Sequence, residues 1–391
     1  MDETGNKSMD LSQARSEIDR VDDDILRLFI ERMKLAERAA QVKQAAGLPL
    51  QNRAREREIL ARAYEVARER SMGIYAHRLF ASIIELSRAY QSDLLAGNQP
   101  SAVRTLIERS LKPAETTFPR GGRIAVQGIE GSHSQRAAEK LFPLASIVFF
   151  KTFAGVFNAV TKGFCSHGVV PAENSTNGSV RAVFDLLRTR GCYVVRSTTV
   201  QIRHELLTMP GADPSEITTI YSHEQALGQC SHFLDSLGGK VRAIPCENTA
   251  VAARMVAESG DSHAAAISSA YCAGVYGLEI ARSDIGDSDN NYTRFFCVSH
   301  EPVIYAGSDR TCIVAGVDNK PGALYNILQR LAAREIDMTK LESIPVPGSD
   351  FEYNFIIELG ASVRDEGVMS LLEELERDCP VFDFLGCYAD E

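Results

Sequence analysis

The sequence lacks the features that define several classes of protein. No apolar run reaches the ~18 residues of a membrane span. The N-terminal segment has no basic stretch followed by an apolar one, as a secretory signal requires. The nine cysteines are scattered without a C-x-x-C pair, which is typical of reduced cytosolic thiols and argues against a zinc site. We therefore expect a cytoplasmic protein with no membrane partner and no metal site.

The charge balance argues against nucleic acid as the main partner, because the net charge is -10. A site for a small anion would then need a local cluster of cations. The contents of hydrophobic residues, 45%, and of charged residues, 24%, are those of a soluble globular protein. A chain of 391 residues is too long for one hydrophobic core, so we expect several domains.

The pattern of hydrophobic residues divides the chain into three regions joined by a linker. Residues 9–95 have a helical period and predict three helices, at about 10–46, 52–71 and 74–95. Residues 96–121 predict a linker with one amphipathic piece, "VRTLIERSL". Residues 122–300 alternate short β-rich runs with helical ones, which indicates an α/β domain with mostly parallel strands. Residues 308–391 follow the order β-α-β-β-α-β of a ferredoxin-like domain.

An arginine interrupts the apolar stripe of the first predicted helix. In alternating steps of three and four from Leu11 to Val42, nine of ten positions suit the seam of a helix bundle, and the exception is Arg32. This helix would span ~50 Å, too long for the two shorter helices to cover, so we expect an intertwined homodimer or a higher homo-oligomer. Arg32 could simply extend toward solvent or pair with a glutamate.

Further polar residues favour a ligand over that structural explanation. Lys43 is turned only ~20° from Arg32 on an ideal helix, and Arg15 lies beside the same seam. The second and third helices add Arg55, Glu56, Ser87 and Gln91. Four cations, a carboxylate and two neutral polar groups suit a small dianion that bears a hydroxyl, because buried unpaired cations are costly.

This segment resembles the all-helical, dimeric type of chorismate mutase. The resemblance implies that Arg32 and Arg15 of the other chain hold the two carboxylates of chorismate, and that Arg55 lines the substrate. Lys43 and Gln91 would donate to the ether oxygen, Glu56 would bind the hydroxyl, and Ser87 would line the pocket. Asn52 stands where the family often has Asp and can still cap the second helix.

Three clusters distinguish the middle segment: "GIEGSHSQRAA", "VVPAENSTNGSV" and "NNYTRFFCVSH". The first two could be ordinary turns. In this order, with "YSHEQALGQC" before the third, they resemble prephenate dehydratase, a domain of two α/β lobes like a periplasmic binding protein, with its site in the cleft between the lobes. The resemblance implies Thr293 as proton donor or orienter and Arg294 as a carboxylate partner. It also implies a cleft lined by Glu173, Asn174, Ser175, Ser222, Gln229 and Phe295.

Two histidines of the middle segment, His204 and His223, are possible acids. A single histidine in such a position is more often structural, so we do not assign catalysis to either.

The C-terminal segment, with "DNKPGALYNILQRL" and "KLESIPVPG", resembles an ACT domain of the phenylalanine-sensing kind. The resemblance implies that Gly322, Ala323 and Leu324 let the effector approach a helix start, and that Glu342 and Ser343 line the same interface. The family usually has arginine at the next position, where this chain has Ile344. A purely structural dimerisation domain is the alternative.

Together the resemblances imply a bifunctional enzyme that converts chorismate to prephenate and prephenate to phenylpyruvate, with phenylalanine as effector. They also imply that no cofactor is needed. Two alternatives stay open: arogenate as the substrate of the middle domain, and a non-catalytic amino-acid sensor.

Overall fold

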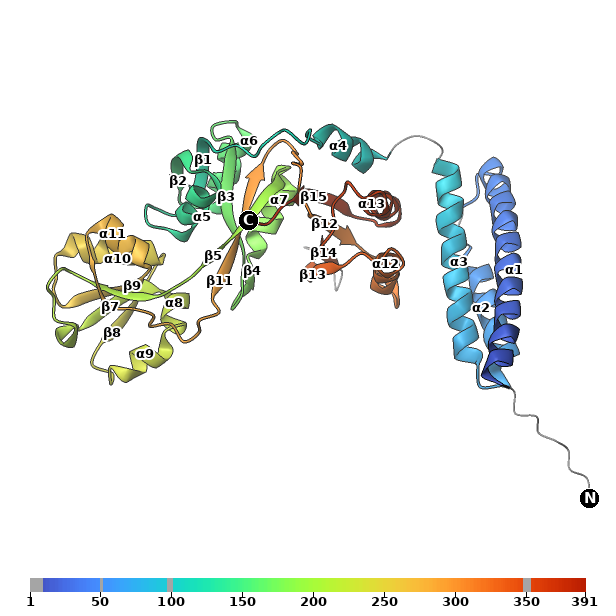
Figure 1. Cartoon of the computed structure of the whole chain (residues 1–391), viewed down its shortest axis with the longest axis horizontal. Coiled ribbons are helices and arrows are strands. Elements are labelled where there is room, and N and C mark those ends of the chain that lie inside the picture. The colour runs from blue at the N-terminus through green and yellow to red at the C-terminus, as the bar shows by residue number, and fades with distance from the viewer. Residues whose placement is uncertain (1–9, 50–51, 97–100, 347–352) are drawn as a thin grey trace, which may run out of the picture. The chain divides into compact units, whose positions relative to one another are not determined.

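The computed structural model describes residues 10–49, 52–96, 101–346 and 353–391. The chain divides into two compact units, residues 1–100 and residues 101–391 (Figure 1). In the described ranges, no helix is both long and apolar enough to cross a bilayer, and no group of side chains has the composition of a metal site.

The first unit consists of three helices, as the sequence predicts: α1 (Leu11–Ala45), α2 (Arg53–Arg68) and α3 (Gly73–Ala96). The Asn52 side chain caps α2 by accepting the Arg55 backbone N–H at 3.1 Å. Helix α3 packs against both α1 and α2. The large apolar residues of the α1 stripe are nevertheless half exposed or more in the single chain: Leu11, Ile18, Val21, Ile25, Leu28, Leu35 and Val42.

The second unit begins with a two-lobed α/β domain. The first lobe has the sheet order β2-β1-β3-β11-β5, with β4 beside β3. Its elements are β1 (Gly121–Gln127), α5 (His133–Leu141), β2 (Leu144–Phe150), α6 (Phe153–Thr161), β3 (His167–Asn174), β4 (Gly178–Ser179), α7 (Arg181–Arg190), β5 (Tyr193–Gln201) and β11 (Tyr292–Ser299).

The second lobe has the sheet order β10-β6-β9-β7-β8. Its elements are β6 (Glu205–Thr208), the short 3₁₀ turn η1 (Pro214–Glu216), β7 (Thr219–His223), α8 (Glu224–Gly228), α9 (Ser231–Ser236), β8 (Arg242–Cys246), α10 (Thr249–Ser259), β9 (Ala264–Ser268), α11 (Ala270–Tyr276) and β10 (Glu279–Arg282). Helices cover the sheets of both lobes (Figure 1).

The prediction of mostly parallel strands is wrong, because both sheets are mixed. Strand β1 is parallel to β2 and β3, and β7 is parallel to β8 and β9. Strand β11 is antiparallel to β3 and β5, and β6 is antiparallel to β9 and β10. The chain leaves the first lobe through β5 and returns through β11, so β11 must run against its neighbours.

The C-terminal domain confirms the predicted order β12 (Arg310–Gly316), α12 (Ala323–Ala332), β13 (Met338–Pro345), β14 (Tyr353–Leu359), α13 (Glu366–Asp378) and β15 (Phe382–Tyr388). The strands lie in the ferredoxin-like order β13-β14-β12-β15. One sheet face, which includes Ile313 and Ile357, joins a core with residues of α12 and α13. Residues of the opposite face, including Val314 and Ile356, join a core with the first lobe.

Part of the predicted linker belongs to the core of the C-terminal domain. Helix α4 (Ala102–Ser110) places Val103 and Ile107 in the same apolar core as α13. Arg104 forms salt bridges with Glu366 at 2.6 Å and Glu373 at 2.8 Å. Residues 102–110 therefore form an integral helix, because the amphipathic piece has an apolar face to bury.

Strand β15 approaches β5 of the first lobe so closely that only glycine fits at one position. Gly386 has φ 144°, and a Cβ there would lie 2.2 Å from the Val194 carbonyl oxygen. Nearby, the Thr198 hydroxyl donates to the Glu391 carbonyl at 2.8 Å. The ferredoxin-like domain is thus packed directly on the lobe.

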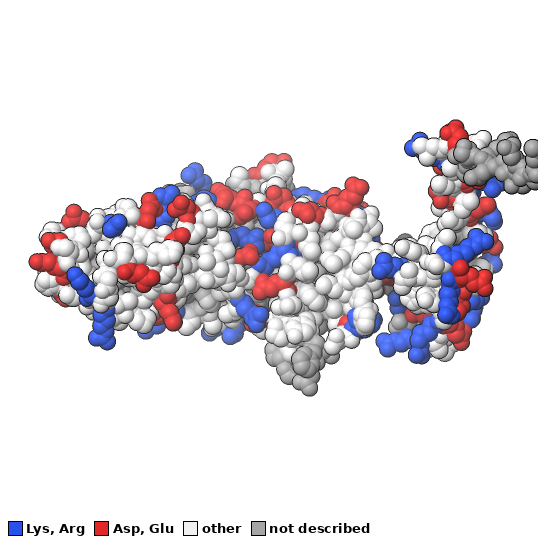
Figure 2. All heavy atoms as spheres, turned by 90° about the horizontal axis from the view of Figure 1, so that it is seen from below, with Lys and Arg blue, Asp and Glu red and all other residues white. Residues whose placement is uncertain are grey.

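On the face shown in Figure 2, basic and acidic side chains of the chain are interspersed.

His167 predicts a pH-dependent stability of the second unit. The centre of its ring lies 5.3 Å from the centre of the Phe142 ring and 6.1 Å from that of the Phe118 ring. Burial lowers the pKa of His167 to about 4. Because the unfolded chain binds the proton more tightly, this group stabilises the fold above pH ~6.5, and that contribution is lost as pH falls toward 4. We expect His167→Phe to reduce this acid-induced loss by on the order of 2 kcal/mol.

The measurement is the urea midpoint at several pH values between 7.5 and 4.5. His300→Gln, at an exposed histidine, is the control and should retain the wild-type dependence. Parallel plots of urea midpoint against pH for wild type and His167→Phe would contradict the attribution of this acid-induced loss to His167.

Candidate active sites

The first candidate site lies between α1 and α3. The Arg32 guanidinium donates to the Ser87 hydroxyl and, at 3.3 Å, to the Ile83 carbonyl. Four residues along α3, the Gln91 side-chain amide donates to the Ala36 carbonyl at 2.7 Å. Burial lowers the pKa of the Arg32 guanidinium. The structure therefore brings together Arg32, Ser87 and Gln91, three of the residues selected from the sequence.

The remaining residues selected in this unit are more dispersed. The Glu56 carboxylate lies 3.8 Å from the Arg88 guanidinium of α3, a residue that the sequence analysis missed. Arg55 is exposed and pairs with Glu58 at 2.9 Å. Lys43 is half-buried near the end of α1, and Arg15 is exposed near its start. Arg15 precedes Arg32 by seventeen residues, or ~25 Å along the helix, so one chain cannot bring them together.

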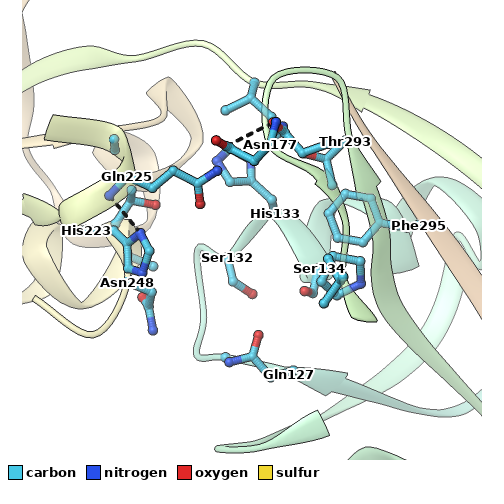
Figure 3. Close-up of a pocket in the computed structure, with 18 of the residues that line it drawn as sticks. Gln127, Ser132, His133, Ser134, Asn177, His223, Gln225, Asn248, Thr293 and Phe295 are labelled. Atoms are coloured by element: carbon cyan, nitrogen blue, oxygen red, sulfur yellow. Dashed lines mark hydrogen bonds between the residues drawn. The ribbon is translucent and has the colours of Figure 1, made fainter. Parts of the chain in front are cut away.

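The second candidate site is a cleft of about 430 Å³ lined by residues of both lobes. Thr293 and Phe295 face it from β11, and Asn174 and Gln229 line it as expected. Figure 3 shows the side chains of Ser132, His133 and Thr293 from the first lobe across from those of His223, Gln225 and Asn248 from the second. The cleft therefore offers many hydrogen-bonding groups in a partly closed space.

A chain of amide contacts links Thr293 to the second lobe. The Asn174 side-chain amide donates to the Thr293 hydroxyl oxygen at 2.9 Å and to the Asn291 side-chain oxygen at 2.9 Å. The Asn291 amide donates to the Gln229 side-chain oxygen at 3.0 Å, and the His204 Nε2 lies 2.8 Å from that oxygen. Because Thr293 accepts the Asn174 N–H, its own proton can point elsewhere, including into the cleft.

Strand alternation corrects the placement of two predicted cleft residues. Successive side chains of a strand point to opposite faces, so Arg294 faces away from Thr293 and Phe295. Its guanidinium donates to Glu358 at 2.9 Å and to Glu173 at 3.2 Å, and Arg294 does not line the cleft. Glu173, opposite Arg294 in the register, is directed the same way.

Two serines are also misplaced by the sequence analysis. Ser222 is fully buried in β7 and donates to the Ile267 carbonyl at 2.6 Å. Ser175 bonds the Asn290 carbonyl at 2.9 Å and accepts the Tyr292 N–H at 3.0 Å. Both hydroxyls hydrogen-bond backbone groups, and neither serine is among the residues that line the cleft.

Helix N-termini supply the positive potential of the cleft. The starts of α5, α8 and α10 all contribute lining residues, and Ser132, His223 and Asn248 cap them. Among the described residues that line the cleft, none is Lys or Arg, and Glu247 is the single carboxylate. The expected cation cluster is therefore absent there, and free backbone N–H groups are available to an anion instead.

His133 is a cleft residue that the sequence analysis missed. Burial, with Arg136 and His204 as nearby positive charges, lowers the pKa of His133 to about 3, so its ring is neutral near pH 7. Burial also lowers the pKa of His204. His223 is occupied in capping, because its Nδ1 accepts the Gln225 N–H at 3.3 Å. The signal for His133 was its place at the first position of α5, directly after the glycine turn.

The five predicted effector residues lie on two elements, the start of α12 and strand β13. Gly322 adopts φ 85° at the start of α12, with Ala323 and Leu324 following it half-buried. Glu342 lines a hollow between β13 and the β3–β4 hairpin that contains no residue of 322–324. Ser343 is exposed, and Ile344 is buried in the core shared with the first lobe.

Comparison with known proteins identifies both catalytic regions. Residues 14–92 match the chorismate mutase type II family, and residues 124–303 match the prephenate dehydratase family. The chain is therefore an enzyme that joins an isomerase to a lyase. It is 31% identical over 381 residues to the bifunctional chorismate mutase/prephenate dehydratase of Aquifex aeolicus (strain VF5), covering 97% of this chain and 98% of that protein. The chain belongs to the family of bifunctional chorismate mutase/prephenate dehydratases.

Two further similarities concern the second unit. Arogenate dehydratase/prephenate dehydratase 1 of Arabidopsis thaliana is 36% identical over 283 residues, covering 68% of this chain and 71% of that protein. The crystal structure of a prephenate dehydratase from Arthrobacter aurescens in complex with L-Phe is 29% identical, with a TM-score of 0.63. It covers 68% of this chain and 90% of that chain.

Asn174 offers a test of the amide chain. Asn174→Ala removes the donor that orients the Thr293 hydroxyl, so we expect dehydratase turnover to fall by about 10²-fold, with mutase turnover unchanged. The measurement is kcat for both reactions on the same preparation. Asn290→Ala, at an exposed neighbour, is the control, and equal losses in the two variants would contradict the assignment.

Proposed function

We propose that the protein catalyses two consecutive steps toward phenylalanine, chorismate to prephenate in the helical unit and prephenate to phenylpyruvate in the two-lobed domain, under feedback from phenylalanine. The observation that carries the proposal is the cleft in which Asn174 holds the Thr293 hydroxyl, in the same chain as the Arg32–Ser87–Gln91 group. The two sites differ in charge and shape, as two different reactions require.

In the helical unit, Arg32 binds one carboxylate of chorismate, and Lys43 and Gln91 stabilise the ether oxygen as its bond to carbon breaks. Positioning and electrostatics suffice for a pericyclic rearrangement, since no proton or nucleophile is exchanged. Glu56 accepts a hydrogen bond from the ring hydroxyl, and Arg55 and Ser87 line the rest of the pocket. The second carboxylate binds Arg15 of another copy, because Arg15 of the same chain is too far away.

The proposal therefore includes a homodimer in which the exposed α1 stripe is covered. Six of its large apolar residues, from Leu11 to Leu35, repeat at steps that face one side of the helix and are half exposed or more. An apolar surface of this length on a soluble protein marks an interface. A second copy of α1 has the matching length and pattern, and it also delivers Arg15.

In the cleft, prephenate loses its ring carboxylate as carbon dioxide and its ring hydroxyl as water. The electron pair of the carbon–carboxylate bond enters the ring, which becomes aromatic as the carbon–oxygen bond breaks. Thr293 hydrogen-bonds and orients the departing hydroxyl and passes it a proton from cleft solvent, so that it leaves as water, while Asn174 and Gln229 fix the position of Thr293. The N-termini of α5 and α10 receive the carboxylate that stays on the product.

Arogenate is a second candidate substrate, favoured by one observation. Glu247 is the single carboxylate among the described lining residues, and arogenate carries an ammonium group where prephenate has a keto oxygen. One of the similar proteins is named for both substrates. Comparison of kcat/KM for the two substrates, in wild type and Glu247→Gln, separates the candidates, because only the arogenate reaction should weaken in the variant.

The C-terminal domain acts as an ACT-type sensor for phenylalanine. Gly322, Ala323 and Leu324 form one half of the effector site, and Glu342 and Ser343 of a second copy form the other half. Ile344 fills the core shared with the first lobe, so a charged residue at this position would be buried. The matches to two enzyme families argue against a sensor without catalysis, and Thr293→Ala should accordingly lose dehydratase turnover.

The direct test is to supply purified protein with chorismate alone and follow chorismate, prephenate and phenylpyruvate, with and without phenylalanine. Appearance of phenylpyruvate, suppressed by phenylalanine, supports all three assignments. Accumulation of prephenate alone would contradict the dehydratase assignment, and no reaction at all would favour the sensor.

Arg32 provides a test of the mutase site alone. Arg32→Ala removes the guanidinium that binds a substrate carboxylate, so we expect kcat/KM for chorismate to fall by about 10²-fold or more. Turnover of supplied prephenate should be unchanged. Arg27→Ala, at an exposed arginine that pairs with Asp24 on the same helix, is the matched control. Full mutase activity in a folded Arg32→Ala protein would overturn the site.

A further inference from the structure

Lys340 of β13 bonds both arms of the β3–β4 hairpin of the first lobe. Its Nζ donates to the Glu173 carboxylate at 2.7 Å and to the Ser179 hydroxyl, and Glu173 and Ser179 are cross-strand partners. The Lys340 side chain is only 10% exposed, and its Nζ lies 5.9 Å from the centre of the Phe184 ring. Such a buried ammonium depends on these partners, because leaving it unpaired would be costly.

The same hairpin forms part of the dehydratase cleft. Asn174, Asn177, Gly178 and Ser179 line the cleft, and Asn174 immediately follows Glu173 and holds the Thr293 hydroxyl. Asn177, Gly178 and Ser179 also line the hollow that contains Lys340 and Glu342. One short hairpin thus separates the cleft from the ferredoxin-like sheet, and its two sides contact the two regions.

A second contact joins the same two regions one strand away. Glu358 of β14 is almost fully buried, and it accepts hydrogen bonds from Arg294, Thr339 and Tyr388. Although burial alone raises its pKa, bonds from these partners and the charge of Arg294 lower the pKa of Glu358 to about 2. Arg294 adjoins Thr293, so the strand that carries Thr293 is also attached to the ferredoxin-like sheet.

We propose that Lys340 is a positioning residue for the dehydratase reaction, supplied by the C-terminal domain. It holds the hairpin where Asn174 can orient Thr293, without itself touching substrate. Lys340 also lies 3.4 Å from Glu342, a member of the proposed effector site. An amino group bound at Glu342 competes with Lys340 for that carboxylate. Occupancy of the effector site therefore changes how strongly Lys340 bonds the hairpin.

This inference rests on the proposed dehydratase and effector sites. The variant is Lys340→Met, which keeps the length of the side chain and removes its charge. We expect the dehydratase kcat to fall by about 10-fold to 10²-fold, with a much smaller change in KM, because substrate contacts remain. The response to phenylalanine should be lost while phenylalanine still binds in equilibrium dialysis. Mutase turnover reports that the protein is correctly quantified, and retained phenylalanine binding reports that the C-terminal domain is folded.

The controls separate positioning from a general loss of packing. Lys162→Met, at an exposed lysine of the first lobe, should match wild type. Lys340→Arg, which keeps the charge, should restore part of kcat. In a double-mutant cycle, Lys340→Met and Glu173→Gln should be strongly non-additive, since both break the same bond. If Lys340→Met does not fold, Glu173→Gln with Ser179→Ala loosens the same contact from the hairpin side and should show the same loss of kcat.

The outcomes have distinct meanings. Loss of kcat and of the phenylalanine response in Lys340→Met supports the inference. An active, phenylalanine-inhibited wild type with an unchanged Lys340→Met would overturn it, as would additive effects in the cycle. A wild type with no dehydratase activity, or with no response to phenylalanine, would instead overturn the proposed function itself.

Discussion

The alternation of side chains along β11 is the constraint that organises the second unit. Thr293 and Phe295 face the cleft, so Arg294 between them must face the opposite side. A buried guanidinium there requires carboxylates, and Glu358 and Glu173 provide them from two directions. The chemistry on one face of the strand therefore demands a charged layer on the other face. The ferredoxin-like domain supplies half of that layer.

This requirement explains why the C-terminal domain is packed tightly on the lobe. Arg294, Lys340, Glu173 and Glu358 form a network in which each charge has at least one partner of opposite sign. Separation of the two domains would break the Arg294–Glu358 and Lys340–Glu173 pairs, and loss of such largely buried pairs costs more than loss of an exposed pair. The glycine contact at Gly386 adds a steric constraint. Dehydratase geometry and the C-terminal domain are consequently coupled through electrostatics as well as through apolar contact.

The limits of sequence reasoning follow from the same features. Helical period predicted α1, α2 and α3 closely, and the order of elements predicted the ferredoxin-like domain. The motif T-R-F located β11 but gave Arg294 a cleft position, although strict alternation already separated it from Thr293. No pattern could show that Lys340 reaches Glu173, because that contact joins residues 167 positions apart. The mixed sheets also depend on where the chain returns between lobes, which local periodicity does not contain.

The contrast between the two sites has a chemical logic. Chorismate keeps both carboxylates through its rearrangement, so full cations such as Arg32 can bind them without opposing the reaction. Prephenate must release one carboxylate as carbon dioxide, and a guanidinium paired with it would stabilise the reactant more than the transition state. The described lining of the cleft accordingly presents helix N-termini and neutral amides, with no Lys or Arg. Under the proposed function, these partial charges and neutral groups would hold the leaving carboxylate less strongly than a guanidinium would.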